Sequence, residues 1–177
     1  MSTDRELLTE ALQTALQMEK DGYSFYDRAA ERTQSKQGKL VFRYVMQEEL
    51  EHMRRITQEH EALVTTGQWQ APGEQIGSIG PGKAPSIFPK SEAEIEARVS
   101  THADDLEALK LAIKIETDGI NFYSETAGKT TDPLGKSFFK WLAGQEKEHR
   151  KIFEDYYDYL ENPSYWFQLH NNPIIEG

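Results

Sequence analysis

The sequence of 177 residues contains no cysteine, which excludes disulfide bonds, thiolate metal sites and cysteine nucleophiles within it. It also lacks any stretch approaching the roughly 18 apolar residues of a membrane-spanning helix, and residues 1–6 lack the apolar segment of a secretion signal. We therefore expect a cytoplasmic protein that makes no use of a membrane. Positive charge is scarce too, since 20 basic residues stand against 30 acidic ones, for a formal net charge of −10. This balance argues against binding to nucleic-acid phosphates.

What the sequence does contain is a repeated pattern of Glu and His. Each half has one isolated Glu, followed 30 residues later by a Glu-x-x-His motif, and corresponding residues are 97 positions apart (116 − 19, 146 − 49 and 149 − 52). The six residues are Glu19, Glu49 and His52 in the first half and Glu116, Glu146 and His149 in the second. The neighbouring segments Glu-Lys-Asp-Gly-Tyr-Ser-Phe-Tyr and Glu-Thr-Asp-Gly-Ile-Asn-Phe-Tyr repeat as well. We interpret residues 1–177 as one domain made of a duplicated unit.

Apolar residues at spacings of three and four predict long helices over about 3–32, 35–66, 102–128 and 133–160. Asp132 is expected to cap the fourth helix, with Pro133 in its first turn. Between the second and third helices, residues 67–101 begin with a stretch rich in Gly and Pro, and a short helical segment is expected over 91–99. These features predict an all-α four-helix bundle of two hairpins, at about 3–66 and 102–161, joined by a long crossover. The aromatic tail, 162–177, is expected to pack on the bundle or on a second subunit.

Each of the four helices carries a Glu in the middle of its apolar stripe, without a Lys or Arg at neighbouring inward positions. Burying unpaired carboxylates is costly, so we expect them to bind metal. One Glu from each of two helices and a Glu-x-x-His from each of the other two form the ligand set of dinuclear sites in bundle cores. Glu49 and Glu146 would bridge the ions, and Glu19 and Glu116 would each pair with one His. Oxygen-rich ligands favour iron or manganese over structural zinc. The alternative to a metal site is that the two Glu-x-x-His motifs form two Glu/His pairs on the solvated surfaces of their helices.

With these residues, the two Phe-Tyr pairs and the Trp-Phe and Asn-Pro-Ile segments near its end, the chain resembles the rubrerythrin-like proteins of the ferritin-like di-iron superfamily. The resemblance covers essentially the whole chain. It implies a ferritin-like bundle with two iron ions that react with hydrogen peroxide or dioxygen, and a peroxidase activity used against oxidative stress.

The chain departs from the rubrerythrin pattern at two positions. Rubrerythrins carry an extra ligand Glu where this chain has Gly119, and a carboxylate where it has His149. The ligand set is in this respect closer to that of bacterioferritin. The Cys-rich rubredoxin domain is absent from this sequence, so we expect electrons to come from a separate donor, such as a rubredoxin-like protein.

Other residues are candidates for supporting the ligands. Tyr26 and Tyr123 follow Glu19 and Glu116 by seven residues, so a phenol could hydrogen-bond a ligand carboxylate, although a core role is equally compatible with this spacing. Further candidates of this kind are the residues that directly precede the expected bridging pair, namely Glu48 and Gln145. Gly22 and Gly119 recur one turn after the isolated Glu in each half, and we hypothesise that they leave space for a small oxidant or for close helix packing.

Three functions are compatible with this sequence. The first, which we favour, is a di-iron oxidoreductase that reduces peroxide or dioxygen. The second is a ferroxidase or iron-handling protein, although a storage cage would need a fifth helix or equivalent contacts. The third is a non-catalytic bundle that metal only stabilises. A homodimer, with or without exchanged helices, is compatible with the long crossover.

Overall fold

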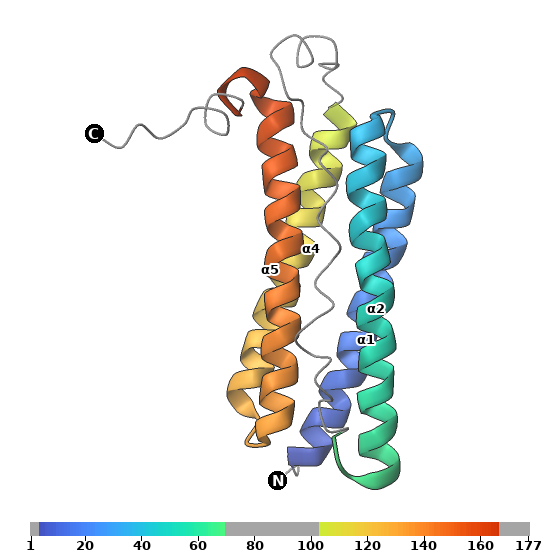
Figure 1. Ribbon diagram of the computed structural model, residues 1–177, viewed down its shortest axis with the longest axis vertical. Helices are drawn as coiled ribbons and strands as arrows, with labels where there is room; N and C mark the ends of the chain where they lie inside the picture. Colours follow the sequence, from blue (N-terminus) through green and yellow to red (C-terminus); the bar gives the residue numbers. More distant parts are fainter. Residues whose placement is uncertain (1–3, 70–102, 167–177) are drawn as a thin grey trace, which may run out of the picture.

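The computed structural model describes residues 4–69 and 103–166, and these residues form long helices without any strand. In chain order the helices are α1 (Asp4–Arg32), α2 (Lys36–Thr66), α4 (Ala103–Lys129) and α5 (Pro133–Glu161), arranged as an elongated bundle (Figure 1). The predicted all-α class is confirmed, and the predicted helix bounds agree with the structure to within one or two residues. The expected crossover from residue 70 onward, the helical segment over 91–99 and the tail from residue 167 lie outside the described residues.

The helix ends follow from local sequence. Ser35 caps α2, because its side-chain oxygen accepts a hydrogen bond from the Gly38 N–H at 3.1 Å. Gly67 ends the same helix in the left-handed conformation, with φ of 73°, which a residue without a Cβ adopts at little cost. As predicted, Asp132 caps α5 and accepts hydrogen bonds from the N–H groups of Leu134 and Gly135 at 2.8 and 2.9 Å.

Each copy of the repeat forms one antiparallel hairpin. The helices α1 and α2 pack closely on each other, as do α4 and α5, whereas contacts of α1 with α4 and of α2 with α5 are sparser. Polar side chains tie the hairpins together at both ends of the bundle. At one end the Asp4 carboxylate accepts hydrogen bonds from the Thr130 hydroxyl and the Asp132 N–H, and at the other the Thr33 hydroxyl donates to Asp105 at 2.7 Å.

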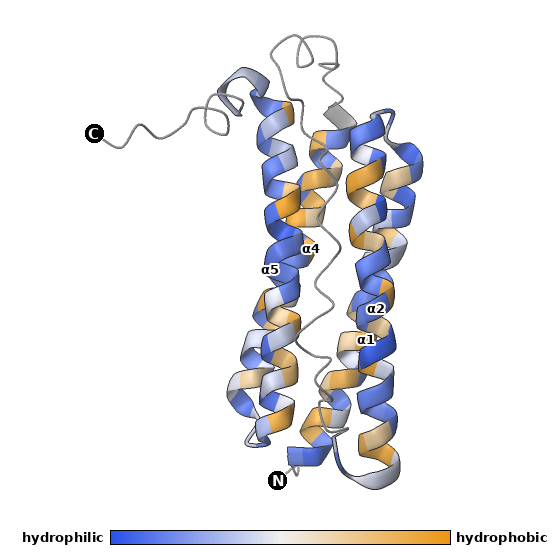
Figure 2. Cartoon of the chain, in the orientation of Figure 1, coloured by the Kyte–Doolittle hydropathy of each residue, from blue (hydrophilic) through white to orange (hydrophobic). Residues whose placement is uncertain are grey.

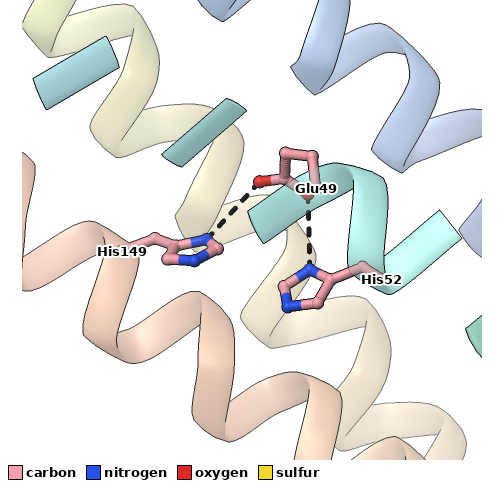
Figure 3. Close-up of side chains that lie close together, drawn as sticks. All are labelled: Glu49, His52 and His149. Atoms are coloured by element: carbon pink, nitrogen blue, oxygen red, sulfur yellow. Dashed lines mark ion pairs between the residues drawn. The ribbon is translucent and has the colours of Figure 1, made fainter. Parts of the chain in front are cut away.

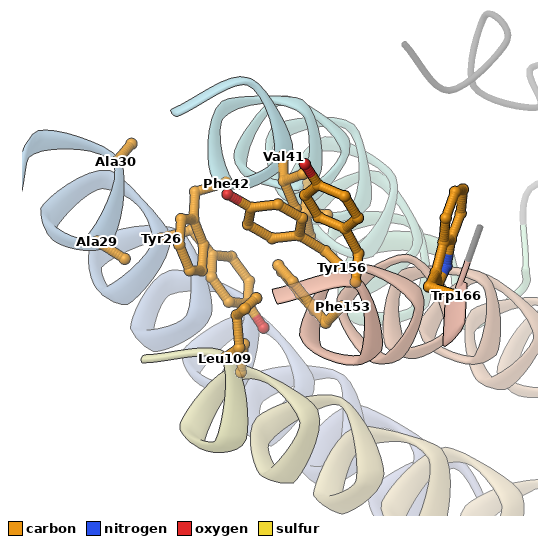
Figure 4. Close-up of a cluster of buried hydrophobic side chains, with 12 residues drawn as sticks. Tyr26, Ala29, Ala30, Val41, Phe42, Leu109, Phe153, Tyr156 and Trp166 are labelled. Carbon is orange, nitrogen blue, oxygen red and sulfur yellow. The ribbon is translucent and has the colours of Figure 1, made fainter. Parts of the chain in front are cut away.

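Two apolar clusters fill the interior. One contains Tyr26, Phe42, Phe153 and Tyr156, which interleave from three helices (Figure 4). The other lies toward the opposite end and is built around residues such as Leu12, Ile56, Phe139 and Leu142. Hydrophilic and hydrophobic residues are interspersed along each helix (Figure 2). On every helix, the Glu or Glu-x-x-His of the repeat lies between residues of the first cluster and residues of the second, so apolar packing on both sides fixes the position of these polar residues.

Two tryptophans cover the ends of the helices. Trp69, directly after α2, is 7% exposed and packs against Phe138 with ring centroids 5.5 Å apart. Trp166 is 6% exposed and meets the Tyr159 ring edge to face. Trp166, near the start of the aromatic tail, thus packs on the bundle, whereas the expectation for the rest of the tail lies outside the described residues. Among the described helices, none is long and apolar enough to cross a membrane.

Candidate metal centre

All six repeated Glu and His side chains meet in the middle of the bundle. Each is at most 4% exposed, although four of them are carboxylates. Glu19 comes from α1, Glu116 from α4, and the two Glu-x-x-His motifs from α2 and α5. Figure 3 shows Glu49 between the imidazoles of His52 and His149. The alternative of solvated Glu/His pairs on the helix surface is therefore wrong.

Both imidazoles direct their Nδ1 atoms at carboxylates. The Nδ1 of His52 lies 3.2 Å from Glu19 Oε2 and 3.4 Å from Glu49 Oε2 and from Glu146 Oε1. The Nδ1 of His149 lies 3.4 Å from Glu49 Oε1 and 3.7 Å from Glu116 Oε2. The two rings stack with centroids 5.3 Å apart. Glu19 therefore groups with His52, and Glu116 with His149.

Besides a group of three residues, Glu49, His52 and His149, the ligand atoms form two overlapping groups of four that share a pair of residues. Within each group, one potential ligand atom per residue lies within 4.8 Å of the others. The first group is Glu19, Glu49, His52 and Glu146, and the second is Glu49, Glu116, Glu146 and His149. The shared members are Glu49 and Glu146, the two residues expected to bridge. This arrangement can hold two cations side by side.

Several buried polar atoms in this cluster lack a hydrogen-bond partner among the described residues. They are Glu49 Oε2, His52 Nε2, Glu116 Oε2, Glu146 Oε1 and His149 Nδ1. Among the described residues, no Lys or Arg forms an ion pair with these carboxylates. Unsatisfied buried acceptors are destabilising, and a divalent cation would satisfy them. The donor set of carboxylate oxygens and one imidazole nitrogen per group fits iron or manganese.

Without a cation, the cluster retains protons. Burial raises the pKa of both Glu49 and Glu146 well above its usual range, and the nearby carboxylates raise it further. Burial also lowers the pKa of His149, but the nearby carboxylates of Glu116 and Glu49 outweigh it and raise that pKa to about 9. Glu19 behaves oppositely: burial raises its pKa, but a hydrogen bond with Glu49 and the charge of His52 bring it to about 2. The metal-free site thus combines protonated and ionised groups.

Two phenols hydrogen-bond the carboxylates of Glu19 and Glu116, the isolated Glu of each half. Each bond crosses the interface between the hairpins. The Tyr26 hydroxyl donates to Glu116 Oε1 at 2.5 Å, and the Tyr123 hydroxyl donates to Glu19 Oε1. The spacing leaves a core role equally open and does not indicate which carboxylate each phenol reaches; the structure shows the hydrogen bonds. Burial and the adjacent carboxylates raise the pKa of both phenols well above its usual range, so both remain hydrogen-bond donors.

In the described part of the chain, the other candidate residues, two polar residues and two glycines, do not hydrogen-bond the ligands as the phenols do. Glu48 and Gln145 are half-buried, and none of the hydrogen bonds found in the described residues joins them to the six central side chains. A Cβ on Gly119 would lie 3.3 Å from Glu146 Cγ and Oε2, whereas one on Gly22 would meet Tyr26 at 3.6 Å. The hypothesis that Gly119 makes room for an oxidant is therefore wrong, because Glu146 occupies that space.

One neighbour of the site was not identified from the sequence. The ring of Trp141 meets the His52 ring edge to face, with centroids 5.6 Å apart and an interplanar angle of 83°. The repeat could have pointed to Trp141, because the corresponding residue in the first half, at 141 − 97, is also aromatic, Tyr44.

Comparison with known proteins gives one match. The family model described as Rubrerythrin matches residues 107–169, which include Glu116, Glu146 and His149. No curated protein and no solved structure matches the chain. The internal repeat extends the matched pattern to Glu19, Glu49 and His52. The match over the second hairpin and the all-helical bundle confirm the resemblance of this chain to the rubrerythrin family of ferritin-like di-iron proteins.

Proposed function

We propose that this protein is a non-haem di-iron oxidoreductase that reduces hydrogen peroxide or dioxygen with electrons from a separate donor. The observation that supports it most is the pair of overlapping ligand groups that share Glu49 and Glu146. The resemblance to rubrerythrin supports iron as the metal and peroxide as the oxidant.

In this proposal six side chains hold two iron ions. Glu49 and Glu146, which belong to both ligand groups, would be shared between the ions, Glu19 and His52 would serve one of them, and Glu116 and His149 would serve the other. The bound irons would supply redox electrons and Lewis acidity for cleavage of an oxygen–oxygen bond. Manganese could occupy the same ligand set.

The other residues act through orientation and exclusion of water. Tyr26 and Tyr123 hold the carboxylates of Glu116 and Glu19 by hydrogen bonds, which limits their rotation. The apolar clusters on both sides keep bulk water from the ligands. Reduction of one peroxide to two waters consumes two electrons and two protons. The donor supplies the electrons, and the two protons are taken up from solvent.

The test is peroxide consumption by iron-loaded protein with a supplied reductant. We expect turnover in the wild type and its loss in Glu49→Gln and in Glu146→Gln. The matched control is Glu148→Gln, because Glu148 is an exposed Glu directly before His149. Oxidation of Fe(II) without peroxide turnover, with iron retained in large particles, would favour the ferroxidase alternative. Stable iron binding without any redox turnover would favour the non-catalytic one.

A further inference from the structure

The His52 imidazole is held differently from most metal-binding histidines. Its Nδ1 faces the carboxylates, whereas its Nε2 is buried and has no hydrogen-bond partner among the described residues. Metal-bound histidines almost always donate their other N–H to a carboxylate, a carbonyl or water, which fixes the ring. Besides the stacked ring of His149, the indole of Trp141 lies against the His52 ring, edge to face at 5.6 Å between centroids.

Trp141 is itself fixed by an ionic network that leads to the surface. The guanidinium of Arg55 lies over the indole, 4.7 Å from its centroid, within the range of a cation–π contact. The Nε atoms of Arg55 and Arg54 donate to Glu51 at 2.7 and 2.8 Å. Because Arg54 is half exposed, with a side-chain exposure of 51%, the contacts extend from the buried imidazole to the outer face of α2.

We propose that Trp141 is a positioning residue for His52: its indole fixes the imidazole where a hydrogen-bond acceptor would otherwise do so, and Arg55 fixes the indole. This inference rests on the proposed binding of metal at the six central side chains. Aromatic edge-to-face packing is directional, so it can select one ring orientation for the Nδ1 atom that faces the carboxylates.

The same arrangement is missing from the other half of the repeat. The residue that corresponds to Trp141 is Tyr44 (141 − 97), and the residue that corresponds to Arg55 is Ile152 (55 + 97). The His149 side therefore has neither the indole nor the guanidinium. It follows that the two metal positions are inequivalent although their expected ligands are matched, and that only the His52 position depends on Trp141.

The experiment is a titration of the full-length metal-free protein with Co²⁺, followed by visible absorption and by equilibrium dialysis with metal analysis. The wild type should bind two ions per chain. In Trp141→Leu one of the two should bind about 10–100-fold more weakly while the other is unchanged, as for loss of a group that orients a ligand. Trp141→Phe, which keeps an aromatic ring, should restore most of the affinity. Trp69→Phe removes a tryptophan at the end of the bundle and should leave both ions unaffected.

Arg55→Gln provides a second variant should Trp141→Leu fail to fold, and it should weaken the same single ion to a smaller extent. Equal weakening of both ions in the Trp141 and Arg55 variants would indicate a general packing defect and would overturn the inference, as would no change in either ion. In both cases the wild type would still bind two ions, and the proposed metal site would stand. A wild type that binds no Co²⁺ would overturn the proposed function and this inference together.

Discussion

The hydroxyl of Tyr26 donates a hydrogen bond to the carboxylate of Glu116, at 2.5 Å and across 90 residues of sequence. Tyr26 belongs to the first hairpin and Glu116 to the second. The reciprocal bond joins Tyr123 of the second hairpin to Glu19 of the first. Each half of the duplicated unit therefore supplies the donor that orients a carboxylate of the other half. The complete site needs both hairpins.

Removal of one of these hydroxyls should destabilise the metal-free protein. In Tyr26→Phe the buried Glu116 Oε1 loses its donor, and an unsatisfied buried acceptor costs about 1–3 kcal/mol in the free energy of unfolding. Urea denaturation measures this loss. By the symmetry of the repeat, Tyr123→Phe should give a loss of similar size.

Tyr165→Phe is the matched control, because Tyr165 is 56% exposed, and it should change the free energy of unfolding by less than about 0.5 kcal/mol. If Tyr26→Phe lowers the free energy of unfolding by no more than the control does, this hydrogen bond contributes nothing to stability.

Gly119→Ala should impair metal binding more than folding. The new Cβ would lie 3.3 Å from two atoms of Glu146, so the shared carboxylate must move by a few tenths of an ångström. We expect metal affinity to fall about tenfold, which corresponds to about 1.4 kcal/mol, as measured by competition with a chelator.

Two other helical glycines serve as controls for this substitution. A Cβ on Gly22 would meet nothing closer than 3.6 Å, and one on Gly144 would meet nothing within 4 Å. Gly22→Ala and Gly144→Ala should keep the metal affinity and gain up to about 1 kcal/mol in stability from helix propensity. A Gly119→Ala protein that binds metal as tightly as these controls would refute the role assigned to Gly119.

Metal binding should strengthen as the pH rises. The metal-free site holds protons, because the pKa of Glu49 and of Glu146 is raised and that of His149 is about 9. Metal coordination displaces these protons, so linkage makes the affinity increase with pH up to about pH 9. The rise in Tm caused by Mn²⁺ should therefore be larger at about pH 8 than at about pH 6.

The metal-free protein should respond to pH in the opposite direction. The raised pKa of His149 contributes stability that is present below its unfolded value, 6.5, and is lost as the pH rises through about 9. The raised pKa values of Glu49 and Glu146 act in the same direction, since ionising these buried carboxylates becomes a cost above their unfolded value, 4.5. A Tm of the metal-free protein that increased from about pH 6 to about pH 9 would contradict this assignment of protons.

The duplication made most of this site predictable from the sequence. A single Glu-x-x-His can lie on a solvated helix, but two copies 97 residues apart, each with its Glu 30 residues earlier, restrict the four carboxylates to the bundle interior. The pairing of Glu19 with His52 was not predictable, because helical periodicity gives the face of a residue but not the partner across the bundle. The same reason explains why each phenol reaches the carboxylate of the other hairpin.

What the sequence could not reveal is which side chains of one hairpin contact the ligands of the other. The contact of Trp141 with His52 joins α5 to α2, and such contacts between hairpins depend on how the helices are rotated and offset. The role of Gly119 was misread for a related reason. Its missing side chain creates space, but only the packing of α4 on α5 shows that the space belongs to Glu146.

The most direct test of the central claim is the number of Fe(II) ions bound per chain under anaerobic conditions, by titration of metal-free protein and elemental analysis. Two overlapping ligand groups that share Glu49 and Glu146 predict two ions per chain in the wild type. They predict that no ion is retained at comparable affinity when Glu49→Ala and Glu146→Ala are combined, because both of these four-residue groups then lose two ligands. A wild type that binds no iron, or a double variant that still binds two ions as tightly, would contradict the assignment of this cluster as a dinuclear metal site.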